Sequence, residues 1–281
     1  MFHVSLTPGG AARIVQGAAQ RCTPAYQGIL LIVRRARHVA PHETSWKINA
    51  ALQWLWTFVC RTATLYVIRP SRGQDVLDEV LGLDYAGQLT HDGWAPYAGL
   101  TRATHQPCLA HLMRRAHDLL EQGTPATRWF PRRVQELLQE GLGLRDRWRR
   151  TRPGPRQRAR GREGLDQKLE SLLRRRIRDP ANRRFADHLA RYADQMFTFL
   201  EHPGMEATDH WAERAIRPAV VNRKVFGGNR TEAGARAQEI LCSVLRTCQQ
   251  RGGNGFEYLA HVLRVPFCLG RPMSPIALPA S

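Results

Sequence analysis

Two short runs of aromatic and β-branched residues, separated by a polar turn, constrain the fold of this chain most strongly. They are Leu52–Val59 and Thr64–Ile68, and their composition predicts two strands joined as a hairpin. A further strand is expected at about 38–46, and a helix over about 71–82 should follow the hairpin, with the serine at its start as N-cap. A short strand should then end at residues 90–92. This mixture of strands and helices predicts an α/β fold.

The second half of the sequence has a helical pattern. Apolar residues recur at helical spacing along 165–177, 185–200 and 233–250. Residues 152–162 are rich in proline, glycine and arginine, so they are predicted to lack regular structure. A further helix from about Thr208 should stop at Pro218, because proline removes a hydrogen-bond donor from a helix interior.

The charge balance indicates a polyanionic partner. The chain carries 42 Lys and Arg against 24 Asp and Glu, a formal net charge of +18. Residues 128–191 hold 19 Arg and one Lys against eight acidic residues. Solvated helix faces explain single arginines, and a G- and C-rich genome would favour arginine over lysine. For the whole segment we favour a phosphate-facing surface, with nucleic acid ahead of an anionic membrane or an acidic protein.

The cysteines and the apolar runs indicate the cellular compartment in which the protein is expected. The six cysteines are scattered without a CxxC pair, which is typical of free thiols in a reducing cytoplasm. The N-terminus has no signal-peptide pattern, and the apolar run Ile29–Val33 is too short to span a bilayer. We therefore expect a cytoplasmic protein with no membrane partner.

Three polar stretches are candidates for chemistry. They are His42–Trp46 before the predicted hairpin, His91–Tyr97 at a predicted strand end, and Glu206–Arg214 at a predicted helix start. Each also has an ordinary structural explanation. An Asp-Gly pair suits a turn, a Thr-Asp pair suits a helix N-cap, and a glutamate suits an exposed helix face. Considered singly, none of the three identifies a catalytic site.

Together these stretches resemble blocks of the insertion sequence 66 family of DDE transposases. Residues 91–115, with HDGWAPYAGL and HQPCLAHLMRR, resemble the block around the family's second aspartate. Residues 207–230 (ATDHWAERAIRPAVVNRKVFGGNR) resemble its glutamate block, which usually reads Thr-Asn-Asn…Ala-Glu-Arg. Residues 243–263 are similar to its C-terminal helices. The resemblance runs over about residues 25–265, and the blocks occur in the family's order.

The resemblance implies a ribonuclease H-like mixed sheet with a helical insertion and C-terminal helices. The predicted order of strand, hairpin, helix and strand agrees with that fold. The implied division is a helical lead-in at 1–35 and a core at 36–265, with a basic helical insertion at about 122–205. Residues 266–281, rich in proline and small side chains, should form a loose tail.

The resemblance also implies a reaction and residues for it. In the family, three carboxylates hold two divalent ions around the scissile phosphate, for cleavage and strand transfer of DNA. Asp92 and Glu213 would be the second and third carboxylates and the metal ligands, with Mg²⁺ as the ion and Mn²⁺ as an alternative. The implied contacts to DNA phosphates are Arg214, Arg217, Arg223, Lys224, Arg114 and Arg115. Solvated charge near a helix end explains the first four of these equally well.

The first carboxylate is where the pattern breaks, because the family's Asp-Glu-Thr reads His42-Glu43-Thr44 here. Successive strand side chains point to opposite faces, so Glu43 should face away from the site that His42 faces. Imidazole is a poor ligand for Mg²⁺ and brings no negative charge. Pro41 adds a second departure, since proline cannot donate to a central sheet ladder. We expect Mg²⁺-dependent cleavage to be strongly reduced or absent.

Two further observations refine the expectation. Family members usually carry DNA-binding and zinc-binding segments upstream of the catalytic domain, so this chain resembles a truncated copy. The spacing His105-x-x-Cys108-x-x-His111 suggests a metal cluster, but the family block already accounts for these residues, and a structural role is favoured.

Three hypotheses follow. The first is a transposase catalytic domain acting on transposon ends and target DNA, as a homo-oligomer associated with the nucleoid, with no small-molecule substrate. The second is a catalytically inactive remnant that still binds DNA. The third, an unrelated basic nuclease of the same fold, is disfavoured by the blocks around Asp92 and Glu213.

Overall fold

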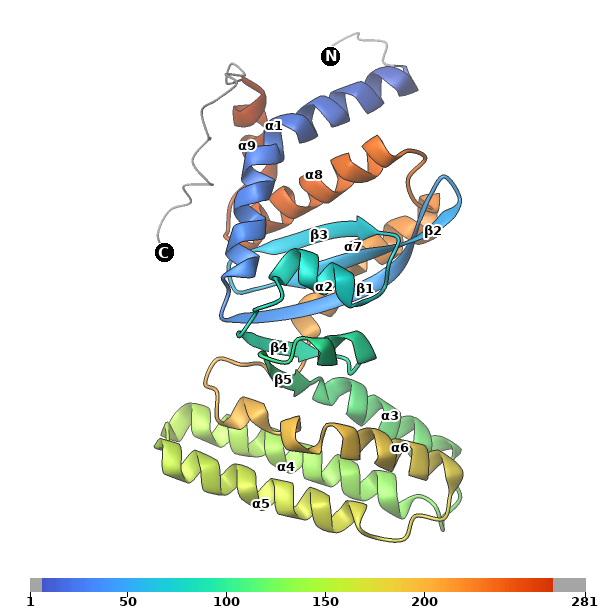
Figure 1. The fold of residues 1–281 in the computed structure, drawn as a ribbon, viewed down its shortest axis with the longest axis vertical. Coiled ribbons are helices and arrows are strands. Elements are labelled where there is room, and N and C mark those ends of the chain that lie inside the picture. Colours follow the sequence, from blue (N-terminus) through green and yellow to red (C-terminus); the bar gives the residue numbers. More distant parts are fainter. Residues whose placement is uncertain (1–6, 265–281) are drawn as a thin grey trace. The chain divides into compact units, whose positions relative to one another are not determined.

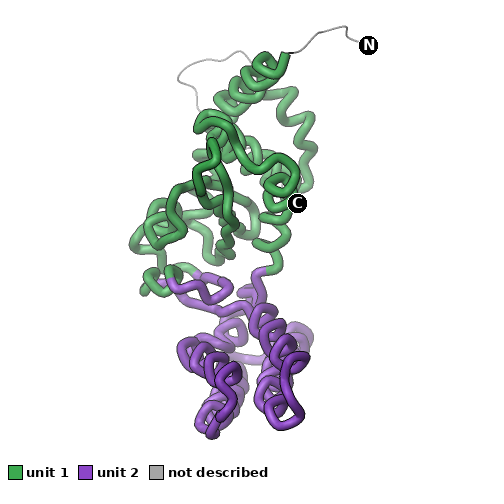
Figure 2. The backbone as a smooth tube through the Cα atoms, turned by 90° about the vertical axis from the view of Figure 1, so that its right-hand side faces the viewer, with its two compact units in different colours: residues 1–87, 96–102, 210–281 green, residues 88–95, 103–209 purple. Residues whose placement is uncertain are grey.

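The computed structural model describes residues 7–264, and this part of the chain divides into two compact units (Figure 2). Unit 1 comprises residues up to 87, 96–102 and the residues from 210 onward, and unit 2 comprises 88–95 and 103–209. The tail predicted at 266–281 lies outside the described residues. Within them, no helix combines the length and the apolar character needed to cross a membrane.

Unit 1 contains an antiparallel sheet of three strands. β1 (His38–Ile48) pairs with β2 (Ala51–Val59), which pairs with β3 (Thr64–Arg69) (Figure 1). The predicted first strand and hairpin are therefore confirmed. β1 also accommodates Pro41, which lies opposite Phe58 of β2.

Five α-helices accompany this sheet in the part of unit 1 that the structure describes. They are α1 (Pro8–Arg34), α2 (Gln74–Leu81), α7 (His210–Phe226), α8 (Glu232–Gln250) and α9 (Gly255–Arg264). α7 packs on β1 and β2, where Ile216 and Ala219 join Trp46 and Leu55 in one apolar cluster. α8 packs on β3 and on α1 (Figure 1). The helical lead-in predicted at the start of the chain thus corresponds to a longer helix.

α8 covers the edge of β3 with polar side chains. Glu239, Ser243 and Thr247 are spaced four residues apart, so they form one stripe along the helix. In this order, they accept hydrogen bonds from the backbone N–H groups of Ile68 at 2.6 Å, Tyr66 at 2.8 Å and Thr64 at 3.1 Å. The acceptors satisfy edge-strand donors that would otherwise be open to pairing with another chain.

Unit 2 combines a parallel strand pair with a helical bundle. β4 (Gln88–His91) pairs with β5 (Thr104–Pro107), as expected for a strand ending just before Asp92. The helices are α3 (Leu109–Gln122), α4 (Trp129–Thr151), α5 (Pro155–Leu173) and α6 (Pro180–Arg191) (Figure 1). One apolar core joins them, with Phe130, Phe185 and Phe197 at its centre. The α/β class is therefore confirmed, with antiparallel strands in unit 1 and parallel strands in unit 2.

Two predictions about helix ends are wrong. The segment 152–162 was expected to be irregular, but only 152–154 interrupt the helices, and Pro155 starts α5. Proline is tolerated there because the first turn of a helix needs no N–H donor. α7 continues through Pro218 to Phe226, although a stop was predicted. Burial of Ile216 and Ala219, on either side of the proline, offsets the lost hydrogen bond.

The start of α2 also differs in detail. Its N-cap is Gly73 rather than Ser71. The Ser71 hydroxyl instead accepts the Gly73 N–H at 2.9 Å and bonds the Asp75 carboxylate at 2.5 Å. The serine therefore shapes the turn before the helix, a role that competes with capping for the same side chain.

Candidate functional site

His42 lies in the middle of β1, on the face covered by α7. Strand side chains alternate, so His42 shares its face with Ala40 and Trp46. Ala40 packs against Ala212 and Ala215 of α7, and Trp46 belongs to the cluster that contains Ile216 of the same helix. The imidazole therefore occupies the helix-covered face of the sheet, where it is half-buried.

Glu43 lies on the opposite face of β1 and is buried, with 7% of the residue exposed. Arg72 donates to Glu43 Oε1 from Nε at 2.9 Å and Nη2 at 2.8 Å, and the Tyr97 hydroxyl donates to Oε2 at 2.9 Å. The guanidinium also stacks over Trp54 at 4.7 Å. Both carboxylate oxygens thus have partners within unit 1, away from the face that carries His42.

Glu213 lies in the first turn of α7 and is half-buried. The neighbouring Ala212 and Ala215 are fully buried against Ala40 of β1. Because Ala40 and His42 are two residues apart on one strand face, this turn of α7 packs next to the part of β1 that bears the histidine. Unit 1 therefore brings the elements carrying His42 and Glu213 together.

Asp92 belongs to unit 2 and directly follows β4. Its Oδ1 accepts the backbone N–H of Trp94 at 2.9 Å, the turn role that an Asp-Gly sequence favours. Gly93 has φ +87°, and its carbonyl accepts the Tyr192 hydroxyl at 2.8 Å. An added Cβ at this glycine would lie 3.2 Å from the His188 ring. The loop is held by α6 and the residue after it, and Asp92 stays partly exposed.

The residue before this aspartate is a fully buried histidine that pairs with another. His91 Nδ1 accepts the Gly93 N–H at 3.1 Å, so the neutral ring carries its proton on Nε2. That nitrogen lies 3.2 Å from His105 Nδ1, which then accepts the hydrogen bond. Burial, together with the His105 charge, lowers the pKa of His91 to about 3. The His91 ring therefore acts as a neutral structural group.

The fold separates the two histidines and the cysteine whose spacing suggested a metal cluster, for which the sequence favoured a structural role. His105 pairs with His91, whereas Cys108 and His111 meet Asp209, which the sequence suggested only as an N-cap. The Cys108 thiol donates to Asp209 Oδ1 at 3.0 Å. Burial and the adjacent carboxylate raise the pKa of this thiol. No local pattern connects residues 101 positions apart, so Asp209 could not have been found from spacing.

The six basic residues expected to contact phosphate differ in their surroundings. Arg214, Arg217, Lys224 and Arg114 are exposed. Arg223 instead donates through Nη1 to Thr44 Oγ1 at 2.9 Å and to the Ser45 carbonyl at 3.2 Å, which ties α7 to β1.

Arg115 is also engaged in packing. Its guanidinium lies 4.9 Å from the centre of the Phe185 ring. Burial, with a contribution from Arg184, lowers its pKa. Arg115 and Arg223 therefore have structural contacts of their own.

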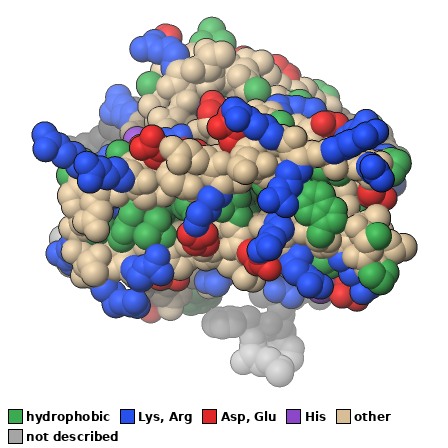
Figure 3. All heavy atoms as spheres, turned by 90° about the horizontal axis from the view of Figure 1, so that it is seen from below, with side chains coloured by type: hydrophobic (Ala, Val, Ile, Leu, Met, Phe, Trp, Pro, Cys, Tyr) green, Lys and Arg blue, Asp and Glu red, His purple; other side chains and the backbone are tan. Residues whose placement is uncertain are grey.

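The arginines of unit 2 are mostly on its surface. Fifteen of the 19 arginines in 128–191 are exposed, and they include Arg174, Arg175, Arg176 and Arg178 near the end of α5. Figure 3 shows blue side chains spread over the visible face, with acidic groups interspersed. The surface is positively charged overall without forming one uninterrupted patch on that face.

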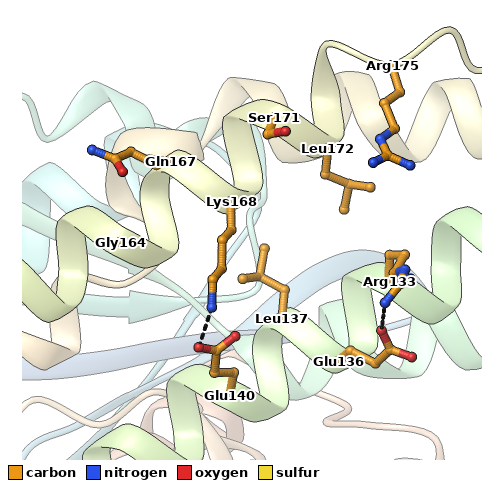
Figure 4. A pocket seen from close by; sticks show the side chains of 10 residues that line it. All are labelled: Arg133, Glu136, Leu137, Glu140, Gly164, Gln167, Lys168, Ser171, Leu172 and Arg175. Atoms are coloured by element: carbon orange, nitrogen blue, oxygen red, sulfur yellow. Dashed lines mark hydrogen bonds and ion pairs between the residues drawn. The ribbon is translucent and has the colours of Figure 1, made fainter.

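A groove of about 670 Å³ lies between α4 and α5 (Figure 4). Lys168 of α5 pairs with Glu140 of α4 across the groove at 2.6 Å, and Arg133 pairs with Glu136 at 2.8 Å along α4. These cations are already neutralised by acids, so the groove lacks the concentrated positive charge of a phosphate site. None of the predicted catalytic residues lines it.

Comparison with known proteins gives a family match and two distant relatives. The model of the IS66 transposase family matches residues 1–237. The uncharacterized protein y4qI of Sinorhizobium fredii (strain NBRC 101917 / NGR234) is 24% identical over 243 residues, covering 75% of this chain and 43% of the relative.

The second relative, uncharacterized protein y4jO of the same strain, is 27% identical over 89 residues, or 32% of this chain and 27% of the relative. The chain thus spans less than half the length of either relative. No solved structure gives a significant match. The family model covers most of the chain, including His42, Asp92 and Glu213, and the chain belongs to the IS66 family of transposases.

Proposed function

We propose that the chain is the catalytic domain of a DNA transposase, with Asp92 and Glu213 as its acidic metal ligands. The observation that carries the proposal is the packing of the Glu213 turn of α7 beside the strand position of His42, inside a chain of the IS66 family. The chain order of β1, β2, β3, α2 and β4 suits a ribonuclease H-like fold, in which these positions hold the acidic ligands.

The donor set does not fit Mg²⁺ fully. Asp92 and Glu213 offer carboxylate oxygens, the ligands that Mg²⁺ prefers, but His42 offers an imidazole without negative charge. Glu43 does not compensate, because both of its oxygens are bonded on the other face of β1. We therefore expect weak or absent cleavage with Mg²⁺, and a better response to Mn²⁺, which accepts nitrogen ligands more readily.

The protein's own residues would serve DNA binding and positioning. The exposed Arg214, Arg217 and Lys224 project from α7, the helix that carries Glu213, and suit contacts to the phosphates of a transposon end. Arg223 would act differently, since it holds α7 to the strand that carries His42 through Thr44 and Ser45. The partners in this proposal are transposon ends and target DNA, bound by a homo-oligomer in the nucleoid.

A DNA-binding remnant is the second candidate. The imidazole at position 42 and the 15 exposed arginines of residues 128–191 favour it, because phosphate binding does not need the missing carboxylate. It predicts DNA binding that weakens steeply with salt and no cleavage with either ion.

Nicking of supercoiled plasmid distinguishes the two candidates. The purified chain and His42→Asp are each assayed with Mg²⁺ and with Mn²⁺. We expect the natural chain to be inert in Mg²⁺, His42→Asp to cut, and Asp92→Asn or Glu213→Gln in the His42→Asp background to abolish cutting. Asp84→Asn, which changes an exposed aspartate, is the matched control and should leave cutting unchanged.

Two results would contradict the proposal. Equal cutting by the natural chain and His42→Asp would mean that another acid completes the site. No cutting by either, with salt-sensitive DNA binding retained in a gel-shift assay, would favour the remnant.

A further inference from the structure

Three side chains of different chemistry converge in unit 2. None of the three is an acidic residue of the proposed catalytic site. Cys108 and His111 are three residues apart at the start of α3, and Asp209 approaches them from the segment that follows the helical bundle. One potential ligand atom from each lies within 4.8 Å of the other two. The Cys108 sulfur is 3.0 Å from Asp209 Oδ1, and His111 Nδ1 is 3.6 Å from Asp209 Oδ2.

Asp209 is the unusual member of the group. Its residue is 1% exposed and its side chain is fully buried. Among the described residues, its Oδ2 has no hydrogen-bond donor, and no Lys or Arg forms an ion pair with it. A buried carboxylate without full compensation is costly, so its oxygen needs a cation or a donor at this position.

Two features of the surroundings would stabilise a Cys108 thiolate once a cation is bound. The backbone N–H of Asp209 points at the Cys108 sulfur at 3.4 Å. Cys108 also occupies the N-cap position of α3, where the positive end of the helix dipole favours a negatively charged sulfur. The same sulfur now donates to Asp209 Oδ1, so a cation that replaces the thiol proton would leave both groups compensated.

We propose that Cys108, His111 and Asp209 bind a Zn²⁺ ion. Thiolate, imidazole and carboxylate together are a donor set for zinc and not for Mg²⁺. On binding, the Cys108 thiol loses its proton to solvent and forms a Zn–S bond, while the imidazole nitrogen and Asp209 Oδ2 supply two further bonds. No electron is transferred, and water takes the fourth position of the tetrahedral ion.

A metal ion bound at this site would strengthen the junction of three chain segments of unit 2. The Cys108 N–H donates to the His91 carbonyl at 2.7 Å, and the Leu109 N–H donates to the Ala207 carbonyl at 2.9 Å. The start of α3 is therefore already bonded to the end of β4 and to the segment leading to Asp209. A bound ion would add a stronger link at the same point and stabilise this junction.

Metal content and cobalt spectroscopy test the proposal on the full chain. The protein is stripped with a chelator and titrated with Zn²⁺, and separately with Co²⁺. We expect one tightly bound Zn²⁺ per chain, and a thiolate-to-cobalt charge-transfer band with tetrahedral absorption in the visible. Ions held only by carboxylates cannot give that band, so the band is independent of whether Asp92 and Glu213 bind metal.

Variants identify the ligands. Cys108→Ser should abolish the charge-transfer band, and Asp209→Asn and His111→Gln should each weaken Zn²⁺ binding by at least about tenfold. His117→Gln, an exposed histidine on the same helix, and Cys242→Ser are the matched controls and should retain binding and band. Circular dichroism verifies folding, and His111, with 26% of its side chain exposed, is the substitution the fold tolerates best.

Two outcomes would overturn the proposal. The first is a folded natural chain that binds no Zn²⁺, or binds Co²⁺ without the thiolate band. The second is unchanged zinc affinity in a folded His111→Gln protein. Either result would leave the cluster as a hydrogen-bonded structural group.

Discussion

Arg72 forms an ion pair with Glu43 on the face of β1 that points away from His42, and two guanidinium nitrogens lie within 2.9 Å of one carboxylate oxygen. The Tyr97 hydroxyl donates a hydrogen bond to the other oxygen of this carboxylate. The neighbouring residues of one strand therefore have separate surroundings. Glu43 is part of a buried ion pair in unit 1, and His42 faces the helix that carries Glu213.

Replacing Glu43 should affect stability rather than chemistry. Glu43→Gln removes the charge opposite Arg72, and we expect the free energy of unfolding to fall by about 2 kcal/mol, the scale of hydrogen bonds to charged groups. Combined with His42→Asp, it should leave nicking by the folded protein unchanged. Urea unfolding and the plasmid assay measure the two effects, and lost nicking in a folded double variant would make Glu43 a ligand.

The buried polar stripe of α8 should contribute more to the free energy of unfolding than the exposed charged residues of this helix do. Glu239→Ala leaves the Ile68 N–H and the Arg69 guanidinium without their shared acceptor, and we expect a loss of about 3 kcal/mol in unfolding free energy. Glu232→Ala changes an exposed glutamate in the first turn of the same helix and should cost about 0.5 kcal/mol. Equal effects in chemical denaturation would mean that the edge of β3 does not depend on this acceptor.

Glu79 should make stability depend on pH in the acidic range. Hydrogen bonds from Arg69 lower the pKa of Glu79 from its usual 4.5. A depressed acid contributes stability above its unfolded pKa, and loses that contribution as the pH falls through the folded pKa. The natural chain should therefore exceed Glu79→Gln in stability at neutral pH and match it well below the folded pKa.

The measurement is urea unfolding of both proteins across this pH range. Glu121→Gln, at an exposed position of α3, serves as the control for a glutamate-to-glutamine change on the surface. A difference that persists unchanged at low pH would contradict the assignment of the shift to the Arg69 pair.

Pro218→Ala should stabilise α7. The alanine restores an N–H donor for the Arg214 carbonyl at an exposed position of the helix, and we expect a gain of about 1 kcal/mol after the greater freedom of the unfolded chain is taken into account. Thermal unfolding would detect the gain, with Ala233→Gly as a control expected to shift stability in the opposite direction. A loss of stability would show that the proline favours a bend that the packing of α7 requires.

Features that depend on neighbouring residues could be predicted from the sequence. The hairpin of β2 and β3 follows from aromatic and β-branched composition around a polar turn, which is a local property. The opposite orientations of His42 and Glu43 follow from the alternation of a strand. The α/β class and the family likewise rest on the type and order of short blocks.

Features that depend on distant partners could not be predicted. α7 continues through Pro218 because Ile216 and Ala219 are buried against the sheet, and a local rule for proline does not include that burial. The buried polar stripe of α8 was not predicted, because the sequence of this helix was interpreted from its apolar residues. The polar residues are buried because they bond to the edge of β3.

The Cys108 and Asp209 contact shows the same division between sequence and tertiary structure. By itself, the sequence determined which residues carry thiol, imidazole and carboxylate groups, and which local elements they occupy. Their convergence was decided only by the tertiary structure, because packing of the helical bundle brings together groups 101 positions apart. Spacing rules describe ligands within one or two turns, whereas burial, which makes the Asp209 carboxylate require compensation, is a property of the folded chain.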